Sequence, residues 1–340
     1  MLFDQFELRG RVLRNRVVSA PLASKSAAPD GGPSDRSLEI YGRFSASGAG
    51  LLVAEHHSVC KNGSVRPQQF SAATDEAAER NAKMAAAIKN NGAVALAQIN
   101  HGGANIADPA LFDDREYRAV SPSGVPVGSC WQALRQKPEI LSAAEIRQII
   151  EDFAAAAVRM VKIAGYDGVQ IHASHGYLLG QFLSPLTNRR GDEWGGSDAK
   201  RARLLYEVTD AVRQSLPEAI VSVRLGIADY LPGEPRKGLS LEETVPVAKE
   251  LAALGADSIH VTGNLCGFGA ARTDEAYFAP CAARIREAVA GTAAVECTGG
   301  VRRAAVAEKL LADGVCDLVG VGRLMLSDSD FLSKWKEELK

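Results

Sequence analysis

The 340-residue chain lacks a cysteine cluster, a long apolar run and an excess of charge of one sign. Its six cysteines are scattered without a Cys-x-x-Cys pair, which argues against a zinc ribbon, a thioredoxin-like motif and a clustered iron–sulfur site. The formal net charge is −2, so the composition favours neither nucleic acid nor an anionic membrane surface as a partner. No apolar run approaches the roughly 20 residues that span a bilayer.

Two further signals are missing. No Gly-x-Gly-x-x-Gly motif follows a first strand, and Gly267-Phe268-Gly269 lacks the third glycine, so a nicotinamide-binding Rossmann domain is not supported. The start of the chain alternates charged with hydrophobic residues and has no secretory apolar segment. We therefore expect a cytoplasmic protein whose cysteines are reduced and mostly buried.

Short apolar or β-branched runs alternate with longer helical patterns, and no break in composition divides the chain. Eight such alternations predict an α/β protein with one (β/α)8 TIM barrel domain over residues 1–340, with a doubly wound sheet as the alternative. The predicted strands are 17–21, 51–54, 94–99, 169–171, 221–225, 258–261, 294–297 and 318–321. Predicted helices include 35–46, 75–90, 142–164, 197–216 and 241–254, and Ser142 with Glu145 predicts a capping box.

An irregular stretch of about 40 residues, 102–141, follows the third predicted strand and is rich in Pro, Gly, Asp and Ser. Connections of this length are uncommon in compact domains unless they are functional. We therefore predict a lid or a wall of the active site there. A second loop of this kind is predicted at 229–238.

Two histidines and a tyrosine, His172, His175 and Tyr177, come directly after the fourth predicted strand. We expect them on the loop and the first helical turn, with both histidines on one helix face and Tyr177 beside them. They can be satisfied polar residues, ligands of a metal, or donors for a ligand oxygen with Tyr177 as a proton source. A metal needs a third ligand, and helical zinc pairs are usually spaced i, i+4. A metal also leaves the unusual flanking sequence LSPLTNRRGDEWGGS without explanation. We favour the oxygen-binding interpretation and predict no metal.

The ends of the last two predicted strands carry glycines, in Thr298-Gly299-Gly300 and Gly322-Arg323. Barrels commonly bind a phosphate between these loops, because glycine lets backbone N–H groups approach it and an arginine can pair with it. Arg224 ends a buried apolar strand, where a charge needs a partner or the mouth of the barrel. Gln98 ends the third strand on the same side.

The segment HASHGYLLGQFLSPLTNRRGDEWGGS resembles the signature of the Old Yellow Enzyme family, in its single-domain bacterial form. Further similarity lies in LRNRVVSAP, AQINHGG, Val223-Arg224, Thr298-Gly299-Gly300 and GVGR, and so covers nearly the whole chain. The resemblance implies an FMN-binding (β/α)8 barrel that reduces activated C=C bonds with NAD(P)H. FMN would be bound tightly but not covalently.

The resemblance also assigns roles. Residues implied to bind the flavin are Pro21, Ala23 and Ala54 along the ring, Gln98 at its pyrimidine edge, Arg224 near N1 and the C2 carbonyl, and Gly299, Gly300, Gly322 and Arg323 at the phosphate. His172 and His175 would bind the substrate carbonyl oxygen. Tyr177 would protonate the α-carbon after hydride reaches the β-carbon.

Several positions depart from the family pattern, among them Ala104 and Lys200, and two lie beside the implied flavin and substrate. Ala23 stands where the family usually has a cysteine or threonine beside the flavin C4 carbonyl, which predicts an altered flavin potential. Lys25 stands where many bacterial members place a tyrosine over the substrate. We expect Lys25 to bind a carboxylate or phosphate on the substrate, or else to reach solvent.

Two other functions stay open. The same flavin site can run as a substrate oxidant, either a desaturase or an amine dehydrogenase-like enzyme. The chain can also be a non-catalytic barrel that binds flavin or a phosphate ligand. For the leading interpretation we expect a small-molecule substrate and diffusible NADPH or NADH, because the sequence offers no cysteine cluster for an iron–sulfur centre. A homo-oligomer is compatible with the resemblance.

Overall fold

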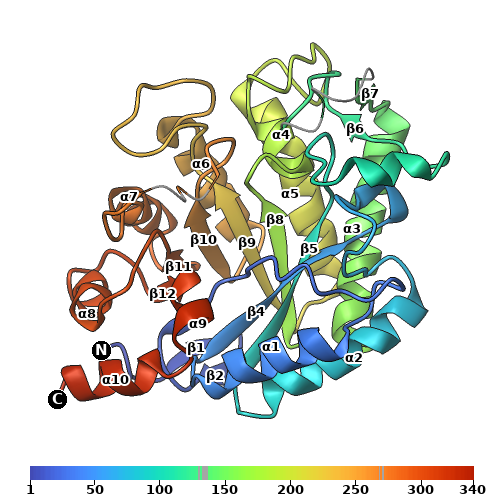
Figure 1. The fold of residues 1–340 in the computed structure, drawn as a ribbon. Coiled ribbons are helices and arrows are strands. Elements are labelled where there is room, and N and C mark those ends of the chain that lie inside the picture. Colours follow the sequence, from blue (N-terminus) through green and yellow to red (C-terminus); the bar gives the residue numbers. More distant parts are fainter. Residues whose placement is uncertain (129–130, 132–136, 268, 270–271) are drawn as a thin grey trace.

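The computed structural model describes residues 1–128, 131, 137–267, 269 and 272–340. Cys130, Phe268 and part of the stretch 102–141 therefore lie outside the described residues. The centre is a closed barrel of eight parallel strands that alternate with helices, which confirms the predicted (β/α)8 fold (Figure 1). In chain order its strands are β3 (Val17–Ser19), β4 (Leu51–Ser58), β5 (Val94–Asn100), β8 (Gly168–Ala173), β9 (Ile220–Gly226), β10 (Ser258–Thr262), β11 (Ala294–Cys297) and β12 (Leu318–Val321).

Pairing of β12 with β3 closes the barrel, with Val319 beside Val17. The described helices are α1 (Asp35–Ala46), α2 (Asp75–Lys89), α3 (Ala143–Lys162), α4 (Leu178–Leu183), α5 (Asp198–Ser215), α6 (Leu241–Ala253), α7 (Ala279–Val289), α8 (Ala304–Ala312), α9 (Arg323–Ser327) and α10 (Phe331–Glu338). The predicted capping box of α3 is confirmed, because the Ser142 side chain accepts from Glu145 N and Glu145 accepts from Ser142 N. Such reciprocal bonds satisfy N–H groups that a helix start leaves unpaired.

An antiparallel hairpin of β1 (Phe6–Leu8) and β2 (Arg11–Leu13) closes one end of the barrel. Leu8 and Leu13 pack in one apolar cluster with Val18, Leu51 and Val94, which lie at the starts of barrel strands. The hairpin therefore covers the amino ends of the strands, near the bottom of Figure 1. The hairpin does not cover the carboxyl ends of the barrel strands, and the site forms there.

The stretch 102–141 is less irregular than predicted. It contains the 3-10 helix η2 (Pro109–Asp113) and a short parallel pair, β6 (Val120–Ser121) with β7 (Glu139–Ile140). Tyr117 and Trp131 belong to a separate small apolar cluster in this stretch, where the Trp131 indole donates to Ala104 O.

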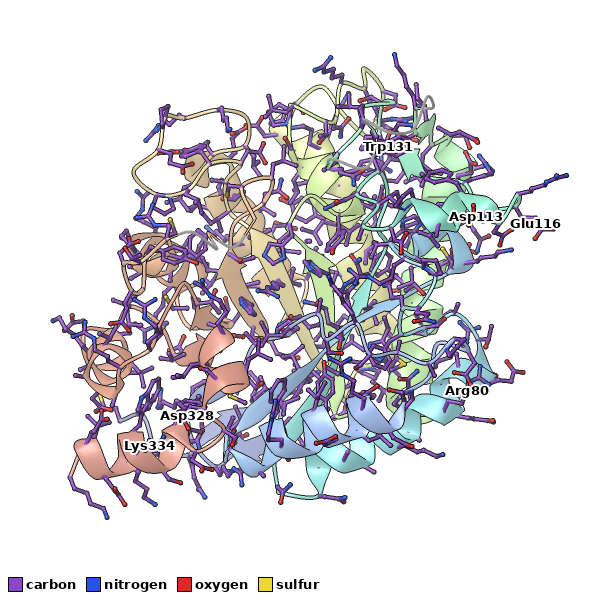
Figure 2. The ribbon with its side chains drawn as sticks, in the orientation of Figure 1. Arg80, Asp113, Glu116, Trp131, Asp328 and Lys334 are labelled. Atoms are coloured by element: carbon purple, nitrogen blue, oxygen red, sulfur yellow. The ribbon has the colours of Figure 1, made fainter. Side chains whose placement is uncertain are left out.

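Charged side chains labelled in Figure 2 lie at the edge of the molecule, and some of them form ion pairs. Lys334 pairs with Asp328 beside α10, and Arg80 of α2 pairs with Asp30. Of the six cysteines, the five described ones are free thiols: Cys60 and Cys266 are half-buried, and Cys281, Cys297 and Cys316 are buried. In the part of the chain that the structure describes, we find no helix long and apolar enough to cross a membrane.

Candidate active site

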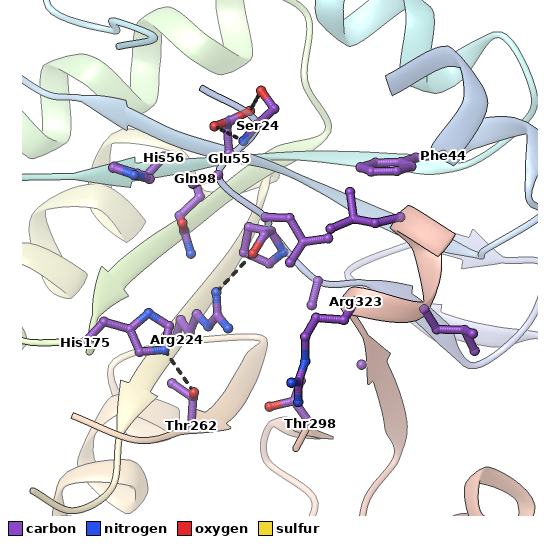
Figure 3. Close-up of a pocket in the computed structure, with 18 of the residues that line it drawn as sticks. Ser24, Phe44, Glu55, His56, Gln98, His175, Arg224, Thr262, Thr298 and Arg323 are labelled. Atoms are coloured by element: carbon purple, nitrogen blue, oxygen red, sulfur yellow. Dashed lines mark hydrogen bonds between the residues drawn. The ribbon is translucent and has the colours of Figure 1, made fainter. Parts of the chain in front are cut away.

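A cavity of about 960 Å³ opens among the carboxyl ends of the barrel strands and the loops that follow them (Figure 3). Most of the predicted site residues line it. They are Pro21, Ala23, Gln98, His172, His175, Tyr177, Arg224, Gly299, Gly300, Gly322 and Arg323. Ala54 and Lys25 are the exceptions. The described residues of 102–141 do not line the cavity, so the lid stays a prediction.

His172, His175 and Tyr177 meet in this cavity, but not on one helix face as the sequence suggested. His172 is still in β8, His175 occupies a left-handed turn with φ 57°, and Tyr177 is the N-cap of α4. The ring centroids are 5.2 Å apart between His172 and His175, and 4.9 Å apart between His172 and Tyr177. The left-handed turn, rather than helical periodicity, brings the two histidines together.

A polar brace behind this turn fixes it in place. The Asn264 amide donates to Gly180 O, and its oxygen accepts from Gly176 N. Gln181 donates to Gly176 O and to Gly102 O, which ties the turn to the loop after β5. A Cβ on Gly180 would lie 2.3 Å from the Asn264 side-chain oxygen, so only glycine fits there. Asn264 and Gln181 therefore position the turn that carries His175 and Tyr177.

Burial sets the protonation of the three rings. It lowers the pKa of His172 and of His175 well below the usual value, and the neighbouring charges of Arg224 and other histidines lower the pKa of both further. Burial raises the pKa of Tyr177, although the positive charges of Arg66 and Arg224 oppose this. Both histidines are thus neutral hydrogen-bonding groups at neutral pH, and Tyr177 keeps its proton.

Arg224 reaches the cavity from the end of β9 and is buried. Its Nη1 donates to Pro21 O at 3.5 Å (Figure 3), and its Nε has no hydrogen-bond partner among the described residues. Burial lowers its pKa to about 10, which still leaves the guanidinium charged at neutral pH. A buried donor without a partner is costly unless a ligand satisfies it. An electron-rich edge of a bound flavin, such as N1 and the C2 carbonyl, would do so.

The opposite end of the cavity has the predicted glycine backbone. Gly299 and Gly300 follow β11 with φ of 112° and 80°, a region that disfavours side chains. A Cβ on Gly299 would lie 3.1 Å from the Phe278 ring, and one on Gly300 would lie 3.0 Å from Asp274 O. Arg323 begins α9 beside these loops. Glycine backbone that lines the cavity and an arginine at this end suit a phosphate, so the donor set of the whole cavity fits FMN.

Glu55 and His56 also belong to the cavity wall but were not predicted from the sequence, whereas the flavin contact of Ala54 stays a prediction. Ala54 belongs to the hydrophobic core and does not line the cavity, whereas Glu55 and His56 do. The pairing of β4 with β5 shifts between Ala54 and His57, so β4 carries one extra residue. Such a bulge re-aims side chains, which lets two successive residues reach one cavity. The sequence did offer one signal for Glu55 and His56, because these polar residues directly follow the predicted strand 51–54.

Glu55 is held by donors from other parts of the chain. Ser24 N donates to it at 2.8 Å, the Ser24 hydroxyl also donates (Figure 3), and Tyr41 OH lies 3.4 Å away. Burial raises the pKa of Glu55 to about 6, and these hydrogen bonds oppose the rise. A fraction of this carboxyl is therefore neutral near pH 6.

Comparison with known proteins now identifies the family. A model of the NADH:flavin oxidoreductase / NADH oxidase family matches residues 1–340. The chain belongs to this family. It is 32% identical over 328 residues to an NADPH dehydrogenase of a Geobacillus strain, which covers 96% of this chain and 91% of that protein. It is also 32% identical over 343 residues to the NADH oxidase of Thermoanaerobacter brockii, but spans only 50% of that longer protein.

The solved structure of the old yellow enzyme homologue from Zymomonas mobilis agrees over the whole chain. It is 26% identical, has a TM-score of 0.82, and covers 100% of this chain and 93% of that one. The resemblance to the Old Yellow Enzyme family is thereby confirmed, and so is its implication of an NAD(P)H:flavin oxidoreductase with FMN as cofactor. The roles of individual residues stay predictions.

Proposed function

We propose that this NADH:flavin oxidoreductase reduces the C=C bond of a small α,β-unsaturated carbonyl compound with NAD(P)H. The observation that carries the proposal is the cluster of His172, His175 and Tyr177, whose rings meet in a cavity that also holds the buried Arg224. Two neutral histidines and a protonated tyrosine are what an activated alkene needs: donors for its carbonyl oxygen and a proton for its α-carbon.

Each residue then has a role. His172 and His175 donate hydrogen bonds to the carbonyl oxygen and so draw electron density from the alkene. Because both rings are neutral, they do not transfer a proton to this oxygen. Contacts with Ser174 Oγ and Thr262 Oγ1, both at 3.1 Å, orient the two rings. Tyr177 protonates the α-carbon. FMN, when bound, supplies the hydride for the β-carbon, and Arg224 stabilises the negative charge that the reduced flavin carries.

The first experiment is the visible spectrum of the FMN-loaded protein, followed by anaerobic NADPH, then NADH, and then an enone such as 2-cyclohexenone. We expect the flavin absorbance to bleach with a nicotinamide and to return with the enone. A flavin that only an organic substrate bleaches would favour the oxidant, and one that neither reagent bleaches would favour a non-catalytic binding barrel.

Tyr177→Phe tests the proton donor. The variant should bind FMN and be reduced by NADPH at the normal rate, because the ring and its packing remain. Reoxidation by 2-cyclohexenone should slow by about 10²–10⁴-fold, the usual contribution of a positioned general acid. Stopped-flow measurement separates the two half-reactions. Reoxidation at the wild-type rate would show that the proton comes from another group.

A further inference from the structure

A small side pocket adjoins the cavity on the side of Tyr177 and His56. It shares Ala23, Glu55 and His56 with the main cavity, and Lys25, Arg66 and Gln69 are among its other lining residues. Lys25 therefore misses the cavity itself but borders this extension of it. The side pocket measures about 10 Å³, which is room for one water-sized group.

Two positive charges border this side pocket. The Lys25 ammonium and the Arg66 guanidinium form no ion pair with the described residues. The charge of Arg66 is close enough to lower the pKa of both Tyr177 and His56. Two cations of this kind, set beside a small recess, favour an anion there.

The one carboxyl group in the wall does not neutralise these cations. Glu55 is directed at Ser24 and Tyr41, which supply its hydrogen-bond donors. With a pKa raised to about 6, Glu55 is still mostly ionised at neutral pH, so one negative charge faces two positive charges. The wall of the side pocket therefore keeps a net positive charge, which Lys25 and Arg66 supply.

His56 adds a directed hydrogen-bond donor. Val65 N donates to Gln69 Oε1 at 2.7 Å, which fixes the Gln69 amide so that its Nε2 points at His56 Nδ1, 3.0 Å away. The Asn100 amide lies 3.3 Å from the same nitrogen. With Nδ1 as acceptor, the proton of the neutral ring is on Nε2. This N–H has no hydrogen-bond partner in the described part of the chain, and His56 lines both the cavity and the side pocket.

We propose that the side pocket binds a carboxylate carried by the substrate, with Lys25 and Arg66 as counter-charges and His56 Nε2–H as a hydrogen-bond donor. Since the side pocket has room for one water-sized group, it takes one carboxylate oxygen while the rest of the carboxylate stays in the main cavity, and a phosphate is larger still. This inference rests on the proposed function and narrows its substrate class to unsaturated carbonyl compounds that carry a carboxylate near the alkene. His172 and His175 hold the carbonyl oxygen while the side pocket orients the other end of the molecule.

The test uses 4-oxopent-2-enoate and its methyl ester, with FMN-loaded enzyme and NADPH. The ester lacks the charge but is larger by a methyl group and activates the alkene more strongly, so each variant is compared with wild type on the same substrate. Lys25→Gln and Arg66→Gln should each lower kcat/KM for the carboxylate by about tenfold, chiefly through KM, and leave the ester within about twofold. Lys83→Gln, an exposed lysine on α2, is the matched control and should change neither substrate.

Equal loss for both substrates would show that Lys25 and Arg66 act only on structure, and unchanged values for the carboxylate would overturn the proposal. Titration of the oxidised flavin spectrum with 4-oxopentanoate and its methyl ester gives the same comparison as Kd without turnover. If wild type reduces neither these alkenes nor 2-cyclohexenone, the proposed function fails. The side pocket is then still judged by whether both variants weaken binding of the carboxylate alone.

Discussion

Asp229 is the residue whose removal should damage the site most without touching the substrate. It is 1% exposed, and four donors meet its carboxylate. Ser184 Oγ and Leu239 N donate to Oδ2 at 2.5 and 2.8 Å, while the Asn264 amide and Leu265 N donate to Oδ1 at 2.8 and 3.3 Å. Since Asn264 also bonds to Gly176 and Gly180, Asp229 indirectly fixes the turn that carries His175 and Tyr177.

Asp229→Ala should lower the free energy of unfolding by about 4 kcal/mol. Each buried donor that loses its partner costs about 1–3 kcal/mol, and water can enter to satisfy some of the four. Burial destabilises the wild-type carboxylate and raises its pKa, and the variant lacks this unfavourable contribution. For 340 residues the entropy of unfolding makes 4 kcal/mol a decrease in Tm of about 6 °C.

Calorimetry of the FMN-loaded protein measures this shift. Asp229→Asn keeps the shape but places an NH₂ group opposite part of the donor set, so we expect about half the decrease. Asp313→Ala is the control, because Asp313 is exposed and only pairs with Lys309, so its removal should cost less than about 0.5 kcal/mol. A Tm for Asp229→Ala within 2 °C of wild type would contradict the inference that the hydrogen bonds of Asp229 stabilise this turn. Turnover of 2-cyclohexenone should also fall, because small misplacements of catalytic groups cost about 10²-fold.

Two further predictions concern the cavity wall. Burial raises the pKa of Glu55 from 4.5 to about 6, so its contribution to stability is complete below pH 4.5 and is lost as pH rises through 6. The free energy of unfolding of Glu55→Gln, relative to that of wild type, should therefore rise by about 2 kcal/mol between pH 4 and pH 7.5, as measured by urea unfolding. A difference between the two proteins that does not change with pH would contradict the raised pKa. Ala23→Cys introduces a polar group beside the flavin ring. It should change the two-electron midpoint potential by about 10–30 mV, the equivalent of one hydrogen bond, and equal potentials would refute the role of Ala23.

The barrel could be predicted from the sequence because its strands are buried on both faces and read as continuous apolar runs. The predicted ranges 294–297 and 318–321 match β11 and β12, and the predicted helix 35–46 matches α1. The hairpin of β1 and β2 could not be predicted in this way. Its strands have three residues each, and its turn places Arg9 and Gly10 at φ of 50° and 70°. Asparagine and aspartate mark such turns in sequence far better than arginine does.

The sequence predicted those active-site residues that lie at the carboxyl ends of regular strands. It did not predict those whose position depends on a local irregularity. Arg224 and Gln98 lie at the carboxyl ends of regular strands and reached the cavity as expected. His56 reaches it through the bulge in β4, and a bulge leaves no reliable mark in a single sequence. Ala54, predicted from the same strand end, lies in the hydrophobic core and does not line the cavity, because the bulge turns the next two residues toward it instead; its contact with the flavin stays a prediction.

The signature segment of the chain is mostly a support for two histidines and a tyrosine. Asn188 donates to Phe182 O and Trp194 O, and Trp194 is buried under the guanidinium of Arg203 at 4.6 Å from its ring centroid. These residues do not line the active-site cavity, so they affect the position of the three rings but do not contact a substrate bound there. His172, His175 and Tyr177 select for an activated alkene, and we expect the choice among such compounds to depend on residues outside the signature, in the loop after β3 and on the β4 bulge. Substitution of Lys25 or His56 should therefore change the substrate specificity, while the signature and the reaction type stay unchanged.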